Sequence, residues 1–123
     1  MATTTLGQDN FETTIKDHDI VLVDWWAEWC GPCRMFAPIF EKASEEHTDI
    51  VFGKIDTEAE RGLSAAAGIS SIPTLMAFKD GSLVFAQPGA LPATALAELI
   101  QAVRDLDIEA ARKAAADKES ATS

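Results

Sequence analysis

Two different hydrophobic patterns follow each other in the first third of the chain. Residues 20–26 are an almost unbroken apolar run, rich in β-branched and aromatic side chains, which is typical of a strand buried on both faces of a sheet. Beyond it, apolar residues recur at helical spacing from Phe36 to Ala43, with charged residues on the other side. This spacing predicts an amphipathic helix that begins at Pro32, where a missing N–H is harmless.

The other apolar segments predict further strands and helices. Strands are expected at residues 3–6, 50–55, 73–78 and 82–87, and helices at 10–17, 57–67 and from Pro92 onward. Asp9 with Glu12, and Thr57 with Glu60, have the spacing of capping boxes that would start two of these helices. Asp80-Gly81 predicts an antiparallel hairpin, whereas a strand between two helices pairs in parallel by default. The expected fold class is α/β, with a mixed sheet of about five strands flanked by about four helices.

Length and composition are those of one globular domain. The chain has 123 residues, of which 47% are hydrophobic and 24% charged. Residues 1–106 are expected to form the domain, and residues 107–123 an Ala-rich, charged tail that is helical or disordered. No apolar stretch is long enough to span a bilayer and the first residues do not resemble a signal peptide, so we expect no membrane association and a cytoplasmic location.

The charge balance bears on the kind of partner. Twenty acidic and ten basic residues give a net charge of −10, which argues against nucleic acid because phosphate binding needs a basic patch. The acidity either keeps the surface soluble or steers the protein towards a basic partner surface.

The two cysteines are the strongest chemical signal in the chain. Cys30 and Cys33 are two residues apart, and such a pair serves either as half of a zinc site or as a dithiol that cycles to a disulfide. His18 and His47 do not have the spacing that would complete a zinc site, so no metal is expected. A strand before the pair and a helix after it favour the dithiol. Cys30, at the positive end of that helix, is expected to be the nucleophile, and Cys33 the resolving thiol that lies further towards the interior.

The segment around these cysteines resembles the thioredoxin family. Residues 21–33 are similar to the thioredoxin signature almost throughout, with Trp25 where a Phe is usual. The likeness covers residues 3–106 and extends to three further motifs, which are Ser71-Ile72-Pro73-Thr74, Lys79-Asp80-Gly81 and Pro88-Gly89-Ala90. It implies the thioredoxin fold and a protein-disulfide reductase. It also implies recharging by a thioredoxin reductase that uses NADPH and FAD, disulfide-containing clients, no cofactor bound to this chain, and a monomer.

Asp24 and Lys54 are candidates for proton transfer. A carboxylate within a buried strand either finds a partner or keeps its proton. Asp24 is therefore either a buried polar residue satisfied by water or a general base for Cys33. The family resemblance implies the second role, with Lys54 nearby to tune the carboxyl.

Client recognition is expected on an apolar surface around Cys30. By resemblance, the Ile72-Pro73 bond is cis and faces the sulfurs, so that the backbone of Ile72 can pair with an extended client segment. The surface would comprise Trp29, Gly31, Pro32, Ile72, Pro73, Gly89 and Ala90. Trp29 has an alternative role as a packing residue. Pro88 and Ser70-Ser71 depart from the family pattern at this rim, which affects partner preference rather than chemistry.

Two other functions compete with the reductase. Related folds act as disulfide oxidases or isomerases, but they usually carry a His between the cysteines, whereas this chain has Gly31-Pro32, the reductase type. A thioredoxin-like binding subunit or chaperone, in which turnover is incidental, is the alternative from another class. The intact set of Cys30, Cys33, Asp24 and Pro73 argues against it.

Overall fold

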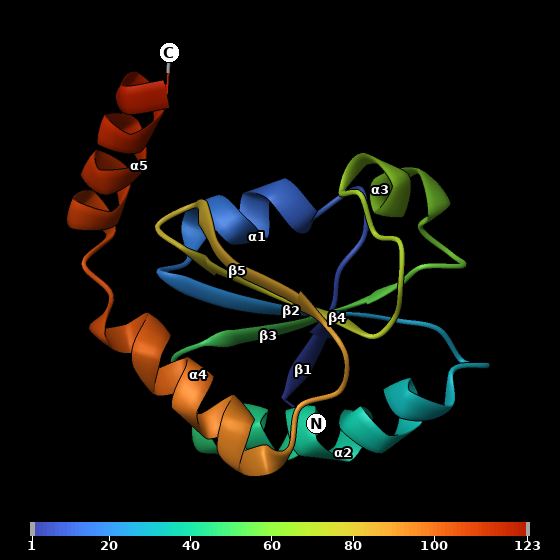
Figure 1. Cartoon of the computed structure of the whole chain (residues 1–123). Coiled ribbons are helices and arrows are strands. Elements are labelled where there is room, and N and C mark those ends of the chain that lie inside the picture. Colours follow the sequence, from blue (N-terminus) through green and yellow to red (C-terminus); the bar gives the residue numbers. More distant parts are fainter. Residues whose placement is uncertain (1, 123) are drawn as a thin grey trace.

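The computed structural model describes residues 2–122 and contains a central sheet with helices on both faces (Figure 1). The strands are β1 (Thr3–Thr5), β2 (Ile20–Trp26), β3 (Val51–Asp56), β4 (Thr74–Lys79) and β5 (Ser82–Pro88). The helices are α1 (Phe11–Asp17), α2 (Gly31–Glu46), α3 (Arg61–Ala66), α4 (Ala93–Asp105) and α5 (Ile108–Thr122). The α/β class is confirmed, and the one helix beyond the expected four is the C-terminal tail.

The sheet is mixed, as the order of elements predicts. Its strands lie in the order β1-β3-β2-β4-β5, with β3 parallel to β1 and β2, and β4 antiparallel to β2 and β5. The β4–β5 turn at Asp80 and Gly81 has positive φ at both residues, the combination that a tight hairpin requires and that Gly tolerates. The buried strand β2 is therefore the centre of the sheet, and it leads directly into α2.

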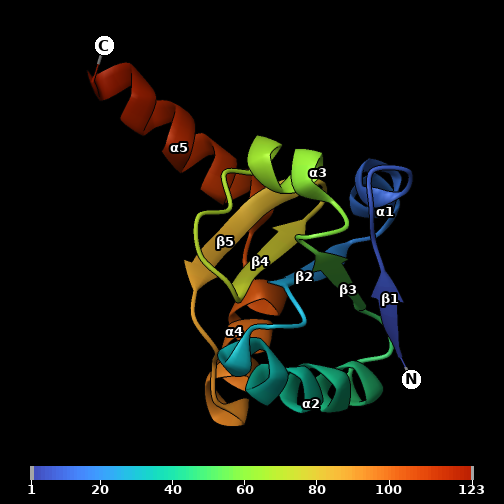
Figure 2. The same cartoon turned by 90° about the vertical axis from the view of Figure 1, so that its right-hand side faces the viewer.

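Alternation along the strands divides the core into two layers. One face of the sheet packs against α2 and α4, and its cluster includes Leu22, Phe36, Phe40, Phe52, Leu96 and Ile100. The other face packs against α1 and α3, and its cluster includes Ile15, Val21, Val23, Trp25, Ile55 and Met76. Figure 2 shows the sheet between these two helix layers. Successive residues of β2 thus serve opposite layers, which places Asp24 and Trp26 on the same face as Leu22, towards α2.

Both predicted capping boxes are wrong, because each helix begins after a different residue whose side chain makes other contacts. The N-cap of α1 is Asn10 rather than Asp9, and its side chain accepts from the N–H of Gly7 at 2.8 Å and donates to the carbonyl of Thr5. The N-cap of α3 is Glu60, and its carboxylate accepts from the N–H of Gln8 at 2.8 Å. These side chains fasten loops to each other instead of capping helices.

Of the last two helices, α4 begins later than expected, whereas a helical tail is one of the two forms expected for residues 107–123. Helix α4 begins at Ala93 with Pro92 as its N-cap, one residue later than predicted. The tail forms α5, which projects from the domain and is held to the β4–β5 turn by Arg112, whose guanidinium donates to the carbonyl of Asp80 and the hydroxyl of Ser82. In the part of the chain that is described, no helix has the length and apolar character that a membrane crossing requires.

Candidate active site

The cysteines lie where β2 ends and α2 begins. Cys30 is the N-cap of α2 and is joined to Cys33 by a disulfide, with the two Cα atoms 5.2 Å apart. The sulfur of Cys30 accepts a hydrogen bond from the N–H of Cys33 at 3.2 Å. An N–H of the first helical turn, which has no partner within the helix, therefore points at the Cys30 sulfur.

Cys30 and Cys33 are exposed to almost the same small extent. Cys30 is 4% exposed and Cys33 is 3% exposed, so both are buried. Ala27, Trp26 and Ile72 pack against the pair and cover both residues. The burial of Cys30 could not be predicted from the local sequence, because Ile72, which packs against the cysteines, lies far along the chain.

The loop before β4 forms the opposite wall of the site. The Ile72-Pro73 peptide bond is cis, and the carbonyl oxygen of Ile72 lies 3.7 Å from the sulfur of Cys30. The N–H of Gly89 donates to the carbonyl of Pro73 at 2.7 Å, and Gly89 has a φ of 109°, which explains a glycine there. The chain thus brings Cys30, Ile72, Pro73 and Gly89 together, and Ala90 follows on the exposed loop to α4.

Asp24 is a carboxyl in the middle of β2 without a hydrogen-bond partner among the described residues. Its side chain is fully buried, and neither carboxyl oxygen has a partner among the described residues. Burial raises the pKa of Asp24 to about 7, and the nearby positive charge of Lys54 partly opposes this rise. Asp24 therefore changes its charge close to neutral pH, which suits a group that exchanges a proton with a thiol.

Lys54 stands next to Asp24 but does not form an ion pair with it. The two residues are partners in the β2–β3 register. The ammonium of Lys54 lies 5.0 Å from the ring centroid of Trp26, and the ion pairs found in the described chain do not include one between Lys54 and Asp24. The prediction that Lys54 lies near Asp24 is confirmed, with Trp26 as a third member of the group.

Trp29 is exposed and held by a residue that the sequence analysis missed. The side chain of Trp29 is 68% exposed, which excludes the packing role, and its indole N–H donates to a carboxylate oxygen of Glu58 at 2.9 Å. The other carboxylate oxygen of Glu58 accepts from Arg61 at 2.7 Å. Nothing in the sequence singles out Glu58, because the contact joins two loops that are far apart in the chain.

Met35 is a second exposed apolar residue next to the redox motif, and the sequence analysis did not single it out. It lies on α2 two positions after Cys33 and is 73% exposed. The sequence does indicate that Met35 is exposed, because it is a large apolar residue outside the apolar stripe that contains Phe36 and Phe40.

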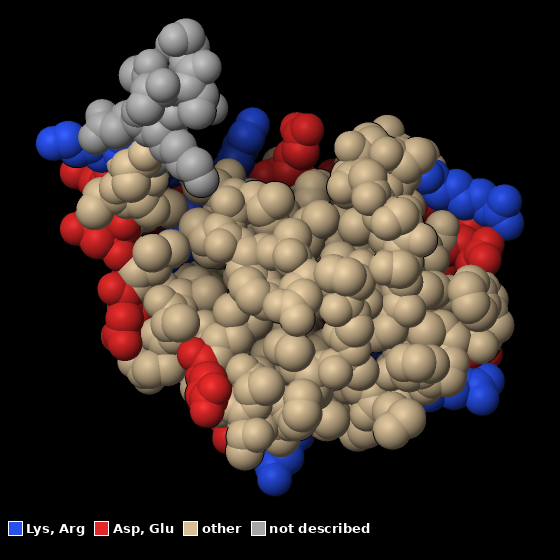
Figure 3. All heavy atoms as spheres, viewed as in Figure 1, with Lys and Arg blue, Asp and Glu red and all other residues tan. Residues whose placement is uncertain are grey.

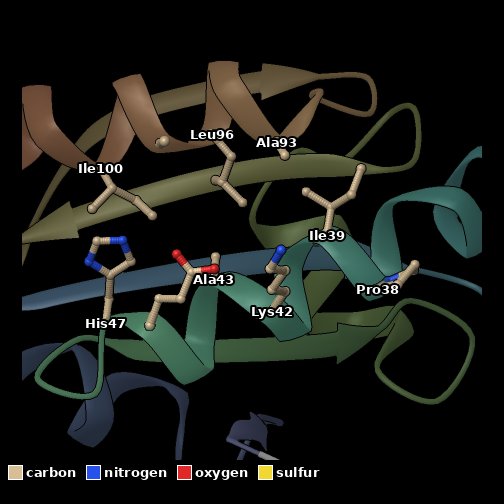
Figure 4. Close-up of a pocket in the computed structure, with 10 residues that line it drawn as sticks. Pro38, Ile39, Lys42, Ala43, His47, Ala93, Leu96 and Ile100 are labelled. Carbon is tan, nitrogen blue, oxygen red and sulfur yellow. The ribbon is translucent and has the colours of Figure 1, made fainter.

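Two hollows lie near α2, and only one of them adjoins the cysteines. The first, of about 310 Å³, is lined by Trp29, Thr57, Ser64, Ile69, Ser70, Ser71 and Ile72, so it continues the wall formed by Ile72 and includes the two serines that depart from the family pattern. The second, of about 330 Å³, lies between α2 and α4 with Ile39, Leu96 and Ile100 at its floor (Figure 4). None of the predicted site residues lines the second hollow.

Comparison with known proteins decides the family. A model of the family described as Thioredoxin matches residues 2–102. The chain belongs to the thioredoxin family. A protein of Streptomyces coelicolor named as a thioredoxin is 52% identical over 118 residues, which cover 96% of this chain and 88% of that protein. A thioredoxin from Coprinus comatus is 42% identical over 95 residues, with coverage of 76% and 89%.

Solved structures agree with this family assignment. A mutant thioredoxin from Halobacterium salinarum superimposes with a TM-score of 0.77 at 36% identity, covering 85% of this chain and 92% of that one. The thioredoxin fold is thereby confirmed. Together with the Cys30–Cys33 disulfide, family membership makes this chain a dithiol oxidoreductase of the protein-disulfide reductase type.

Proposed function

We propose that the chain reduces protein disulfides in two exchange steps on Cys30 and Cys33. The thiolate of Cys30 attacks one sulfur of a client disulfide, and the other client sulfur leaves as a thiolate that takes up a proton. Cys33 then attacks the Cys30 sulfur of this mixed disulfide and displaces the second client thiolate. Two electrons pass to the client, and the Cys30–Cys33 disulfide of the structure is the oxidised end of this cycle. The observation that carries the proposal is the hydrogen bond from the Cys33 N–H to the Cys30 sulfur, which stabilises a thiolate there.

Asp24 would serve as the general base for the second step. Cys33 must lose its proton as it attacks, and Asp24 is a buried carboxyl on the sheet face that α2 covers. Its pKa of about 7 lets it accept a proton at neutral pH and release it to solvent afterwards. Lys54 would limit how high that pKa rises.

The apolar rim would bind clients without requiring a particular sequence. Trp29, Gly31, Pro32, Gly89 and Ala90 are exposed around the cysteines. An extended client segment would hydrogen-bond to the backbone of Ile72, whose carbonyl already faces Cys30, while its side chains rest on Trp29 and in the adjoining hollow.

Electrons would come from a flavoprotein thioredoxin reductase that uses NADPH. The chain itself would bind no cofactor, so NADPH and FAD act only through that reductase. A reducing cytoplasm fits a protein whose two cysteines are both in the redox motif, and we propose a monomer working there.

Coupled turnover tests the proposal. We expect insulin disulfides to be reduced with NADPH and a thioredoxin reductase, and we expect turnover to fall by at least about a thousandfold in both Cys30→Ser and Cys33→Ser, because neither variant can complete the cycle. Cys30→Ser should form no mixed disulfide, whereas Cys33→Ser should trap one on Cys30.

Two results would contradict parts of this proposal. Reduction of insulin with dithiothreitol but no acceptance of electrons from any thioredoxin reductase would leave the chemistry intact and remove the proposed electron donor. Full biological activity of Cys30→Ser in cells would favour the binding subunit or chaperone instead.

A further inference from the structure

Lys54 has two nearby groups that can attract its ammonium. One is Asp24, its partner across the parallel β2–β3 ladder, where neighbouring strands lie about 4.8 Å apart. The other is the ring of Trp26, two residues further along β2 and on the same face of the sheet. The ammonium lies over Trp26 at 5.0 Å from the ring centroid, within cation–π range.

Few other charged or titratable groups face this cluster. On β3, Asp56 is the partner of Trp26, and one of its carboxylate oxygens already accepts from the N–H groups of Glu58 and Ala59. On β4, the residue opposite Asp24 is the apolar Leu75. On the α2 side, the two cysteines do not titrate while they are joined in the disulfide. Glu41 of α2 lies further along the sheet, where its carboxylate accepts from the hydroxyl of Thr3, whereas the β1 partner of Lys54 is Thr5. In the oxidised protein, the attractions of Asp24 and Trp26 therefore determine where the ammonium of Lys54 lies.

We propose that Trp26 is a positioning residue for Lys54, holding its ammonium close to Asp24 but out of contact with it, so that the Asp24 carboxylate stays basic enough to accept the proton of Cys33. This role rests on the proposed function of Asp24 as the base. A Lys54 in direct contact would stabilise the Asp24 carboxylate and weaken it as a base.

The expected direction of the effect follows from a competition. The cation–π contact stabilises the state in which the ammonium lies over the ring, which is the state with neutral Asp24. Weakening that contact frees the ammonium to pair with ionised Asp24, and so the pKa of Asp24 should fall. Phe binds a cation less strongly than Trp and keeps most of the apolar bulk, which makes Trp26→Phe the suitable change.

A double-mutant cycle on the pKa of Asp24 tests the proposal. The carboxyl carbon of Asp24 would be titrated by ¹³C NMR in the oxidised full chain, as wild type, Trp26→Phe, Lys54→Met and the double variant. We expect Trp26→Phe to lower the pKa of Asp24 by about half a unit when Lys54 is present and to have no effect in the Lys54→Met background. Lys54→Met alone should raise this pKa.

The neighbouring tryptophan provides the matched control. Trp25 packs into the cluster on the opposite face of the sheet, so Trp25→Phe should leave the pKa of Asp24 unchanged. Thermal unfolding of each variant would show whether it is folded at the temperature of the titration.

Three outcomes would overturn the proposal. An equal shift in both Lys54 backgrounds would mean that Trp26 acts only by excluding water from Asp24. No shift at all, or a rise in the pKa on Trp26→Phe, would mean that the ring does not hold the ammonium away from the carboxyl. If instead Asp24→Asn had no effect on turnover or its pH profile, the proposed base role would fail, while the NMR cycle would still decide the coupling.

Discussion

At the scale of single residues, Asp24 is the most informative position in the chain. It is fully buried with no hydrogen-bond partner among the described residues, and its pKa lies near 7 instead of the ordinary 3.8. A buried carboxyl of this kind stabilises the fold less than an apolar residue would once it is ionised. The base role proposed above would explain its presence at the centre of the sheet, which packing alone does not.

The stability of an Asp24→Asn variant should therefore depend on pH. Below about pH 4 the carboxyl is protonated in both the folded and the unfolded states, so the free energies of unfolding of the wild type and of Asp24→Asn should differ little. Between 3.8 and about 7 the unfolded state ionises first, and the wild type loses stability as the pH rises. Above about pH 7 the full cost of burying the ionised carboxyl is present, so Asp24→Asn should be more stable by an amount on the order of 4 kcal/mol.

Urea unfolding of both oxidised proteins at several pH values would measure this difference. A gain in stability that stays constant from acidic to alkaline pH would show that the carboxyl titrates normally in the folded protein, contrary to its observed burial.

At the scale of secondary-structure elements, Lys79 connects the sheet to the end of a helix. The ammonium of Lys79, the last residue of β4, donates to the carbonyls of Val103, Arg104 and Leu106 at 2.7, 2.9 and 2.7 Å. These carbonyls belong to the C-terminus of α4, where backbone acceptors are unpaired and the helix dipole favours a positive charge. One side chain thus satisfies three acceptors and fixes the position of α4 against β4.

Replacing Lys79 by Met should lower the free energy of unfolding by about 2–3 kcal/mol, because partly buried carbonyls would lose a charged donor. Denaturant unfolding of the oxidised protein gives this value directly. Lys113→Met, an exposed lysine on α5 with the same change of charge, should alter stability by less than about 0.5 kcal/mol. Equal effects of the two substitutions would mean that net charge, and not the three hydrogen bonds, accounts for the loss.

At the scale of the whole molecule, the charge is distributed unevenly. The net charge is −10, yet between Arg61 and Glu98 the only charged residues are Lys79 and Asp80. In Figure 3 the charged side chains lie around the margin of the view, and the surface over β5 and its flanking loops is uncharged. This stretch also contains Ile72, Gly89 and Ala90 of the active-site rim, so clients would dock on a neutral surface while the molecule as a whole repels anions.

Client charge should therefore affect the rate of encounter more than the contact itself. Among disulfide peptides of equal length, a cationic one should be reduced about two- to tenfold faster than an anionic one at low ionic strength, with a neutral one between them. At about 0.5 M salt the three rate constants should converge, because screening removes the long-range attraction. The assay is single-turnover reduction of each peptide over a range of salt concentrations. A preference for the cationic peptide that persists at high salt would indicate a direct ionic contact in the bound complex.

Some of the fold and site could be predicted from local sequence alone. The apolar run of β2, the helical spacing of α2 and the Asp80-Gly81 turn depend on neighbouring residues, so sequence predicted them within a few positions. The same holds for Cys30 at the positive end of α2, since a pair of cysteines at the start of a helix is recognisable without other parts of the chain, although α2 begins at Gly31, one residue before the predicted start. What the sequence determined by itself is thus the dithiol and the helix end that favours its thiolate.

The tertiary structure decided what surrounds that dithiol. The contacts around the dithiol join residues from different parts of the chain. They are the contact of the Ile72 carbonyl with Cys30, the hydrogen bonds from Gly89 to Pro73 and from Trp29 to Glu58, and the cation–π contact of Lys54 with Trp26. The capping box at Thr57 and Glu60 was wrong for the same reason, since the Thr57 hydroxyl donates to the carbonyl of Trp26 and the Glu60 carboxylate accepts from the N–H of Gln8, both far away in the chain. Local patterns fix which atoms can react, whereas only packing between distant segments fixes their burial and their neighbours, and hence their proton affinity and their access to clients.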